Sequence, residues 1–330
     1  MALSPEGPVA VEPRRALLKI LLRIGIGVAV IGVLVWRTPH RDQLTKALRE
    51  ADKGWVAAAA ALLLVGIVLS ALRWRAYLDA LELSMPLRQI LRLYFVGTFF
   101  NAFLPSGVGG DGYKAVRIGK ARGNYTNAFA SVFLDRFAGF MGLALVGLLG
   151  VTAELASDHE LRVAKIAFVL SAGMLSAGAI LLVGGERLLG RGRVVKEHGI
   201  GGKLRGAVRA IHEAGRHPPA AARGYLFGVA FQTLVLAYHF SLVRALHLKG
   251  VPIGGLAGVV VVASLATMIP LSPGGLGCRE VAYVWALTTF GVARAEATAF
   301  AALVLAILLV TSAIGGLIYL VAGGEVRAPV

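Results

Sequence analysis

The stretch from Trp55 to Leu72 reads WVAAAAALLLVGIVLSAL and contains no charged side chain. A helix rises about 1.5 Å per residue, so a run of this length crosses most of a hydrocarbon core of roughly 30 Å. Comparable apolar runs occur at 17–36, 127–152, 164–183, 224–248 and 295–322. We therefore expect an all-α polytopic membrane protein with about six full transmembrane helices.

Composition supports lipid as the main solvent. Of the 330 residues, 57% are hydrophobic and 16% are charged, and the mean hydropathy is +0.74. The net charge of +16 comes from Lys and Arg in short loops without interleaved aromatic residues, so we expect no nucleic acid as a partner. The single cysteine, Cys278, excludes an intrachain disulfide framework and a cysteine-rich metal site. We expect no metal and no cofactor.

Basic loops predict the orientation of the helices. The linker 184–223 has nine basic and three acidic residues and is expected in the cytoplasm. We expect a cytoplasmic tail over 1–16, a single membrane domain over 17–323 and a C-terminal tail over 324–330. Both termini then lie on the cytoplasmic side of the cell inner membrane. The loop 37–54, which this topology places outside, has five basic and three acidic residues, so its side is left open.

Two shorter apolar segments run into clusters of proline and glycine. The segment 90–112 includes Phe103-Leu-Pro-Ser-Gly-Val-Gly-Gly-Asp111, and the segment 254–280 includes Ile269-Pro-Leu-Ser-Pro-Gly-Gly-Leu-Gly277. Broken helix at membrane depth is tolerated only where protein or a watery cavity satisfies the backbone. We expect two re-entrant helix-break-helix elements. A short segment, a glycine and a long helix follow each one, which favours an inverted repeat with a substrate site at its interface.

The first break is a candidate anion site. Pro105 has no amide hydrogen, Gly109 and Gly110 allow an opened backbone, and a short helix is expected to begin near Asp111. The positive end of that helix and its free N–H groups suit an anionic group such as a lipid phosphate. The alternative is a tight turn without a ligand.

Two adjacent charges lie inside the predicted span 127–152. A charge at this depth costs a few kcal/mol or more unless it is paired or hydrated, so Asp135 and Arg136 are functional candidates. Neighbouring helical residues point in different directions. We expect Arg136 to bind a phosphate and Asp135 to pair with a basic residue such as Lys114 or Arg117. The alternative is a buried ion pair that only fixes packing.

Charged and polar residues also occur in the second half. Arg279 and Glu280 follow the second break, where Glu280 either caps the next helix or belongs with Arg279 to the substrate path. His239 lies within the span 224–248. We expect it to be packed and hydrogen-bonded, and a proton carrier is the less favoured alternative.

The paired breaks resemble a known family, the flippase-like membrane region of lysylphosphatidylglycerol synthetases (multiple peptide resistance factor) and its stand-alone relatives. The similar motifs are Asn101-x-x-Leu-Pro-x-x-x-Gly-Gly-Asp111 with Arg117, Asp135-Arg136, and Ser272-Pro-Gly-Gly-Leu-Gly277 with Glu280. The resemblance extends from about residue 15 to residue 322. It implies a role in moving a lipid between leaflets.

The residues and the resemblance together give one expected substrate-binding set. Its members come from the two breaks, the short helices after them and the charged pair in the first long helix: Asn101, Pro105, Gly109, Gly110, Asp111, Lys114, Arg117, Asp135, Arg136, Pro273, Gly274, Gly275, Arg279 and Glu280.

We therefore expect flippase-like translocation of an anionic or modified lipid, with membrane lipid as the partner; the sequence leaves an oligomer open. The family's synthetases have a soluble aminoacyl-transfer domain after this region, whereas the sequence stops at Val330, and no nucleophile elbow or phosphate loop occurs in it. We expect no self-contained enzyme. The alternatives are an accessory protein or transferase acting on polyprenyl- or lipid-linked sugars, in which Asp111 and Asp135 supply the carboxylates, and a small-solute or ion transporter.

Overall fold

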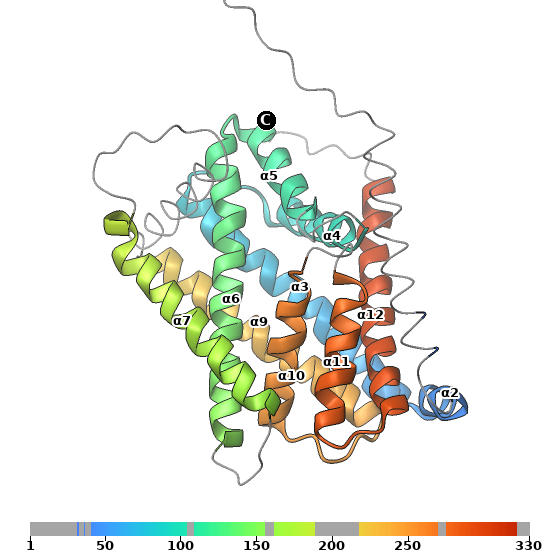
Figure 1. Ribbon diagram of the computed structural model, residues 1–330. Helices are drawn as coiled ribbons and strands as arrows, with labels where there is room; N and C mark the ends of the chain where they lie inside the picture. Colours follow the sequence, from blue (N-terminus) through green and yellow to red (C-terminus); the bar gives the residue numbers. More distant parts are fainter. Residues whose placement is uncertain are drawn as a thin grey trace, which may run out of the picture.

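The computed structural model describes residues 41–103, 109–155, 162–188, 218–269 and 275–321, together with Gly32 and Trp36. The elements in these ranges are α-helices (Figure 1). They are α2 (Arg41–Glu50), α3 (Lys53–Ala80), α4 (Leu87–Phe103), α5 (Gly109–Arg122), α6 (Tyr125–Leu155), α7 (Arg162–Leu188), α9 (Pro218–Ala245), α10 (Ile253–Ala266), α11 (Cys278–Thr289) and α12 (Arg294–Val321).

Five described helices are long and apolar enough to cross a membrane by length and composition. They lie within α3, α6, α7, α9 and α12, and they match five of the six predicted spans. The sixth predicted span, 17–36, lies outside the described residues except for Gly32 and Trp36, and so do residues 189–217 of the basic linker. The prediction of an all-α, multi-pass membrane protein is confirmed.

The two helical hairpins, α4–α5 and α10–α11, begin at opposite ends of the molecule (Figure 1). At the lower end in this view, the amide of Asp52 donates to the carbonyl of Ala245 at 2.9 Å and joins the start of α3 to the end of α9, shortly before α10 begins. At the other end, Arg122 donates to the carbonyl of Ser84 and joins the end of α5 to the loop before α4. The hairpins therefore approach the centre from opposite directions. That either one ends inside the bilayer stays a prediction.

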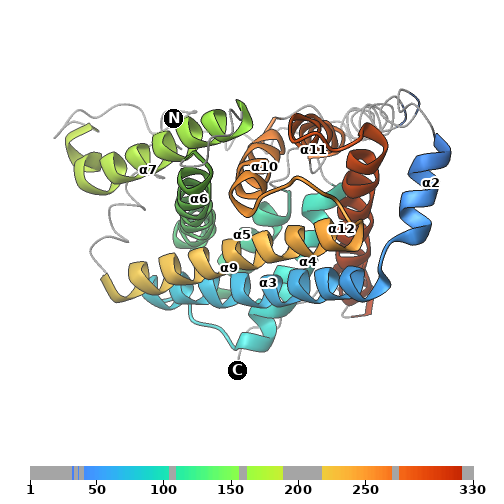
Figure 2. The same cartoon turned by 90° about the horizontal axis from the view of Figure 1, so that it is seen from below.

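The long helices hold the hairpins together. Helix α6 packs against α5 and also against α10, while α12 packs against α11 and also against α4. Each long helix thus contacts its own hairpin and the first helix of the other one. Helices α3 and α9 run side by side beneath them (Figure 2). These contacts tie the two halves of the described chain together.

Two clusters of buried apolar side chains make up much of the core. One buried cluster joins α3, α4, α5 and α6 through side chains such as Leu78, Ile90 and Ile118. A larger one joins mainly α9, α10, α11 and α12 through side chains such as Leu242 and Phe300.

A glycine after each break lets its hairpin close. A Cβ atom on Gly110 would overlap the carbonyl oxygen of Gly97, so α4 and α5 meet backbone to backbone. Gly275 has φ of +73°, and a Cβ atom there would lie 2.6 Å from the Cα atom of Thr267 at the end of α10. Both positions therefore require glycine for close approach, and Gly275 also for its backbone angle.

Candidate functional site

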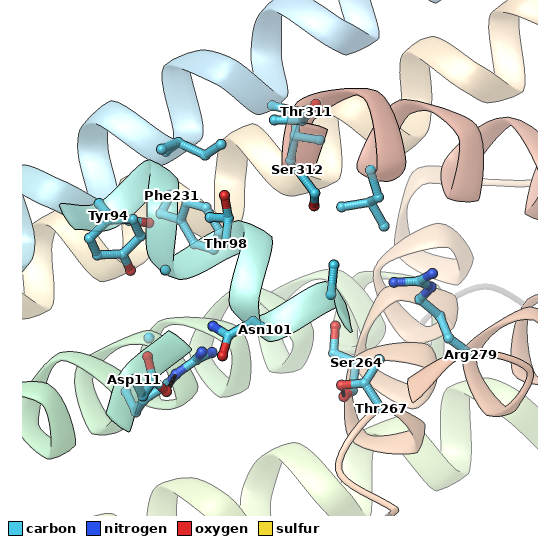
Figure 3. Close-up of a pocket in the computed structure, with 18 of the residues that line it drawn as sticks. Tyr94, Thr98, Asn101, Asp111, Phe231, Ser264, Thr267, Arg279, Thr311 and Ser312 are labelled. Carbon is cyan, nitrogen blue, oxygen red and sulfur yellow. Dashed lines mark hydrogen bonds and ion pairs between the residues drawn. The ribbon is translucent and has the colours of Figure 1, made fainter. Parts of the chain in front are cut away.

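A cavity of about 620 Å³ lies between the two hairpins. Its lining comes from α3, α4, α5, α6, α9, α10, α11 and α12, and includes residues that flank both breaks. In the view of Figure 3, Asp111 from α5 and Arg279 from α11 lie on opposite sides, with Asn101 from α4 between them. Described residues next to the two breaks, far apart in the sequence, therefore contribute to one site.

A row of alternating charges from α3, α5 and α6 lies along one side of the cavity. Arg136 Nε lies 2.5 Å from Asp111 Oδ2, and Lys114 Nζ lies 3.0 Å from Asp111 Oδ1. The same ammonium group is 3.8 Å from Asp135 Oδ2, whose other oxygen is 2.7 Å from Arg73 Nε. We call these five residues the charged row. Its three cations and two carboxylates leave one surplus positive charge.

Most of the charged row is shielded from solvent. The side chains of Arg73, Lys114, Asp111 and Asp135 are 5%, 2%, 6% and 0% exposed, whereas that of Arg136 is 45% exposed. Buried charges are tolerated only when they are paired and hydrogen-bonded, and each carboxylate here has two cationic neighbours. Arg136 is therefore the member with room for another ligand.

Aromatic side chains complete the surroundings of Lys114. Its Nζ atom lies 4.2 Å from the ring centre of Tyr94 and 5.0 Å from that of Trp74, and both rings attract a cation. The Tyr94 hydroxyl donates to Asp135 Oδ2 at 3.0 Å. Tyr94 thus contacts a cation through its ring and a carboxylate through its hydroxyl, which fixes both in place.

Arg73 is a member of the row that the sequence interpretation missed. It lies in α3 beyond the predicted span 55–72, close to the half-exposed Arg75, and so has the sequence pattern of a loop-flanking charge. In the structure its guanidinium is buried between Phe231, whose ring centre is 5.6 Å from Cζ, and Gly139. Among the described residues, its Nη1 atom has no hydrogen-bond partner.

The second half contributes one more cation to the cavity. Arg279 binds Glu280 Oε1 through Nε at 3.1 Å and Nη2 at 2.6 Å, and Glu280 Oε2 accepts the amide of Gly277 at 2.6 Å. Glu280 therefore caps the start of α11, one of the two roles expected for it. Because Gly277 has no side chain, the cap works in this direction only. Arg279 lines the cavity and Glu280 does not.

His239 is packed and hydrogen-bonded, as the favoured interpretation expects. Its Nδ1 lies 2.7 Å from the carbonyl oxygen of Val235, which can only accept, so Nδ1 is the protonated nitrogen. Its Nε2 then accepts from the hydroxyl of Tyr283 at 2.6 Å. Tyr283 lines the cavity and so connects His239 to it.

The expected substrate-binding set falls into three groups. Five members line the cavity: Asn101, Asp111, Lys114, Arg136 and Arg279. Six lie outside its lining: Gly109, Gly110, Arg117, Asp135, Gly275 and Glu280. Pro105, Pro273 and Gly274 lie outside the described residues.

Of the two cations expected near Asp135, Lys114 pairs with it at 3.8 Å, and Arg73, which was not expected, pairs with it at 2.7 Å. The other expected cation, Arg117, donates instead to the Tyr113 hydroxyl at 3.4 Å. Arg136, expected to bind a phosphate, pairs with Asp111.

The backbone at the first break also differs from expectation. The amide of Gly110, expected to be open to an anion, donates to Asn101 Oδ1 at 2.8 Å. A phosphate would have to replace that amide oxygen.

The cavity is chemically suited to an anion. Among the described residues four cationic side chains and one carboxylate line it, and the undescribed break segments 104–108 and 270–274 contain no charged residue. Arginine can bind a phosphate through two donors, and lysine can add a third charge-assisted hydrogen bond. Leu63, Ile67 and Leu309 in the same lining offer apolar surface.

The fold and the cavity define a multi-pass helical membrane protein with a cation-lined cavity. The chain belongs to the family described as the lysylphosphatidylglycerol synthase TM region, whose model matches residues 20–316. This confirms the resemblance.

Three relatives are similar to the chain. A UPF0104 membrane protein of Methanothermobacter thermautotrophicus is 27% identical over 79% of this chain and 82% of its own length. A UPF0104 membrane protein of Pyrococcus horikoshii is 28% identical over 36% of each chain. Glycosyltransferase AglD of Haloferax volcanii is 28% identical over 81% of this chain, which spans about half of that protein, 48%.

Proposed function

We propose that this protein moves an anionic or head-group-modified lipid between the leaflets of the cell inner membrane. The observation that supports it most is the cavity at the two helix breaks, because cations from both halves line it beside apolar side chains. A phospholipid needs these two environments together, one for its phosphate and one for the start of its chains. The family's description also refers to a synthase of a modified phospholipid.

The phosphate would bind first at Arg136. This side chain lines the cavity and is 45% exposed, whereas Lys114 and Arg73 behind it are nearly buried. The surplus positive charge of the row would then be neutralised by one phosphodiester. The basic loops favour cytoplasmic termini, so α4–α5 would start from the cytoplasmic side and α10–α11 from the outer side.

A second candidate function is that of a membrane module acting on lipid-linked sugars. It rests on the similarity of 81% of the chain to a protein named as a glycosyltransferase. Its substrate would present a phosphate to the same cations. A water-soluble, short-chain polyprenyl phosphate that competes with phosphatidylglycerol for the purified protein, and binds more tightly, would favour this candidate.

The experiment is leaflet exchange of fluorescent phosphatidylglycerol in liposomes, normalised to folded protein. We expect Arg136→Ala to lower the rate about tenfold or more, since a charge-assisted hydrogen bond contributes roughly 1.5–3 kcal/mol. Arg136→Lys keeps the charge but loses the two-donor geometry, so an intermediate rate is expected. Arg75→Ala is the matched control, because Arg75 is 43% exposed, pairs with Asp79 and does not line the cavity. Wild-type rates for both Arg136 variants would contradict the proposal.

A further inference from the structure

The two carboxylates of the charged row have similar partners but different positions. Each pairs with its own arginine, and Lys114 lies between them, at 3.0 Å from Asp111 and 3.8 Å from Asp135. Asp111 lines the cavity and Asp135 does not. Asp111 is therefore the carboxylate of the row that faces the cavity, next to the exposed Arg136, whereas Asp135 lies behind the lining.

Asp135 is fully enclosed. Its side chain is 0% exposed, and its oxygens receive hydrogen bonds from Arg73 Nε at 2.7 Å and the Tyr94 hydroxyl at 3.0 Å. Removal of its charge would leave the guanidinium of Arg73 buried without a counter-ion, which is costly. Asp135 is thus the fixed support of the row.

Asp111 has a looser environment. Its Oδ2 pairs with Arg136, the exposed member of the row. Its Oδ1 forms an ion pair with Lys114 but accepts no well-aligned hydrogen bond from the described residues. It lies in the first turn of α5, where the helix dipole also stabilises a negative charge. A carboxylate placed there can leave Arg136 without becoming an isolated buried charge.

We propose that Asp111 is an internal counter-ion that the substrate's phosphate displaces from Arg136. The inference rests on the proposed function and deepens it, because it assigns how the site holds an anion and releases it. The phosphate oxygens replace Asp111 Oδ2 at the guanidinium, while Asp135 keeps Arg73 and Lys114 in place. On release, Asp111 pairs with Arg136 again.

Displacement of Asp111 by the phosphate would let the site bind its substrate and still release it. A site with three uncompensated cations would hold a phosphate tightly, whereas a translocator must bind its substrate weakly enough to let it leave. With both carboxylates ionised, the row has a surplus of one positive charge, which matches one phosphodiester. Without the charge of Asp111 the surplus becomes two. The variant that removes this charge should therefore bind more tightly, an effect that misfolding does not produce.

The test compares Asp111→Asn with Asp135→Asn in the purified full chain. Binding is measured by titration calorimetry with dioctanoylphosphatidylglycerol, with inorganic phosphate and with dioctanoylglycerol, which lacks the phosphate. We expect Asp111→Asn to bind the phospholipid about tenfold more tightly, equivalent to about 1.4 kcal/mol, and dioctanoylglycerol unchanged. Asp135→Asn should show no gain and a lower melting temperature. Asp111→Ser serves as a second variant without the charge.

Unchanged or weaker phospholipid binding by Asp111→Asn and Asp111→Ser would overturn the inference, and so would failure of both to fold, because Asp111 would then be structural. Binding of inorganic phosphate but not of the phospholipid would contradict a lipid as the source of the anion. The proposed function is decided separately: a wild-type protein that binds the phospholipid but exchanges none would refute translocation, while the binding comparison would still decide the role of Asp111.

Discussion

At the scale of single residues, the position of Arg73 depends on the absence of a side chain at Gly139. A Cβ atom at Gly139 would lie 3.0 Å from Nη1 and 3.3 Å from Nη2 of Arg73. That distance is slightly too short, so an alanine would push the end of the guanidinium aside by a few tenths of an ångström while its Nε stays bound to Asp135. The charges of the row would all remain.

We therefore expect Gly139→Ala to fold normally and to lower lipid exchange by roughly three- to tenfold, through partial loss of a charged hydrogen bond from Arg73 to the phosphate. Gly173→Ala is the matched control, because Gly173 is also in a membrane helix and an added methyl group there would have nothing within 4 Å. Exchange at the wild-type rate in Gly139→Ala would show that Arg73 needs no exact placement.

Single-residue interpretation of the sequence found the exposed end of the site better than its buried end. Arg136 and Asp111 are recognisable because a charge inside an apolar run, or after a Pro/Gly break, is unusual. Arg73 follows the apolar run at a place where basic residues normally mark a membrane boundary, and its neighbour Arg75 is indeed half-exposed. Only the packing of α3 against α6 distinguishes the two, and no local pattern encodes that packing.

At the scale of elements, the α4–α5 hairpin closes through Gly110. An alanine there would overlap the carbonyl oxygen of Gly97 and separate the two helices, which also breaks the hydrogen bond from the Gly110 amide to Asn101. We expect Gly110→Ala to lower stability by about 3 kcal/mol, at the upper end of overpacking costs, and to abolish exchange. Thermal unfolding in detergent measures the first effect.

Gly112 provides the control for this prediction on the same helix. Nothing lies within 4 Å of its potential methyl group, and alanine is a better helix former than glycine by about 1 kcal/mol. Gly112→Ala should therefore unfold at the same temperature as wild type or slightly higher. Equal destabilisation by the two substitutions would mean that the close approach of α4 and α5 does not hold in solution.

The length of a helix could be predicted only as far as its apolar run extends. The predicted run 55–72 became α3 from Lys53 to Ala80, because the later turns are supported by buried Arg73 and by the Arg75–Asp79 pair rather than by apolar residues. The glycine expected before each long helix is present as a left-handed turn, with φ of +70° at Gly123 and +79° at Gly291. A turn glycine can be predicted from the local sequence, because its backbone angle does not depend on distant packing.

At the scale of the whole molecule, matched contacts support an internal duplication that includes α3 and α9. Arg73 and Tyr238 each lie 20 residues after the start of their helices, and Asp135 and Val304 each lie ten residues after theirs. Arg73 contacts Asp135, and the Tyr238 hydroxyl lies 3.5 Å from the Val304 carbonyl oxygen. The two halves thus repeat one contact with different chemistry.

A second pair of contacts repeats in the same way. Trp74 comes directly after Arg73, and His239 comes directly after Tyr238. Lys114 lies five residues after the start of α5, and Tyr283 lies five residues after the start of α11. Lys114 lies over the Trp74 ring, and Tyr283 bonds His239. In these two pairs of contacts, the charged residues all belong to the first half. Sequence comparison of the halves could not reveal this, because the equivalent residues share no chemical type.

The opposed hairpins also predict which loops face each side of the membrane. Glu82 and Asn124 flank the α4–α5 hairpin, Lys249 and Ala293 flank the α10–α11 hairpin, and all four are exposed. Since α3 and α9 run antiparallel and the hairpins start from opposite ends, the first two positions should lie on one side and the last two on the other. Because Lys120 and Arg122 lie near the first side, we expect that side to face the cytoplasm.

Single cysteines at these four positions, in a Cys278→Ser background, test this arrangement with a membrane-impermeant maleimide applied to intact cells and to inverted vesicles. We expect Lys249→Cys and Ala293→Cys to react in cells, and Glu82→Cys and Asn124→Cys only in inverted vesicles. A Ser84→Cys variant, next to the same loop, serves as a further cytoplasmic control. If Glu82→Cys and Lys249→Cys react from the same side, the hairpins do not oppose one another across the bilayer. The central cavity would then open to a single leaflet, which is incompatible with exchange between two.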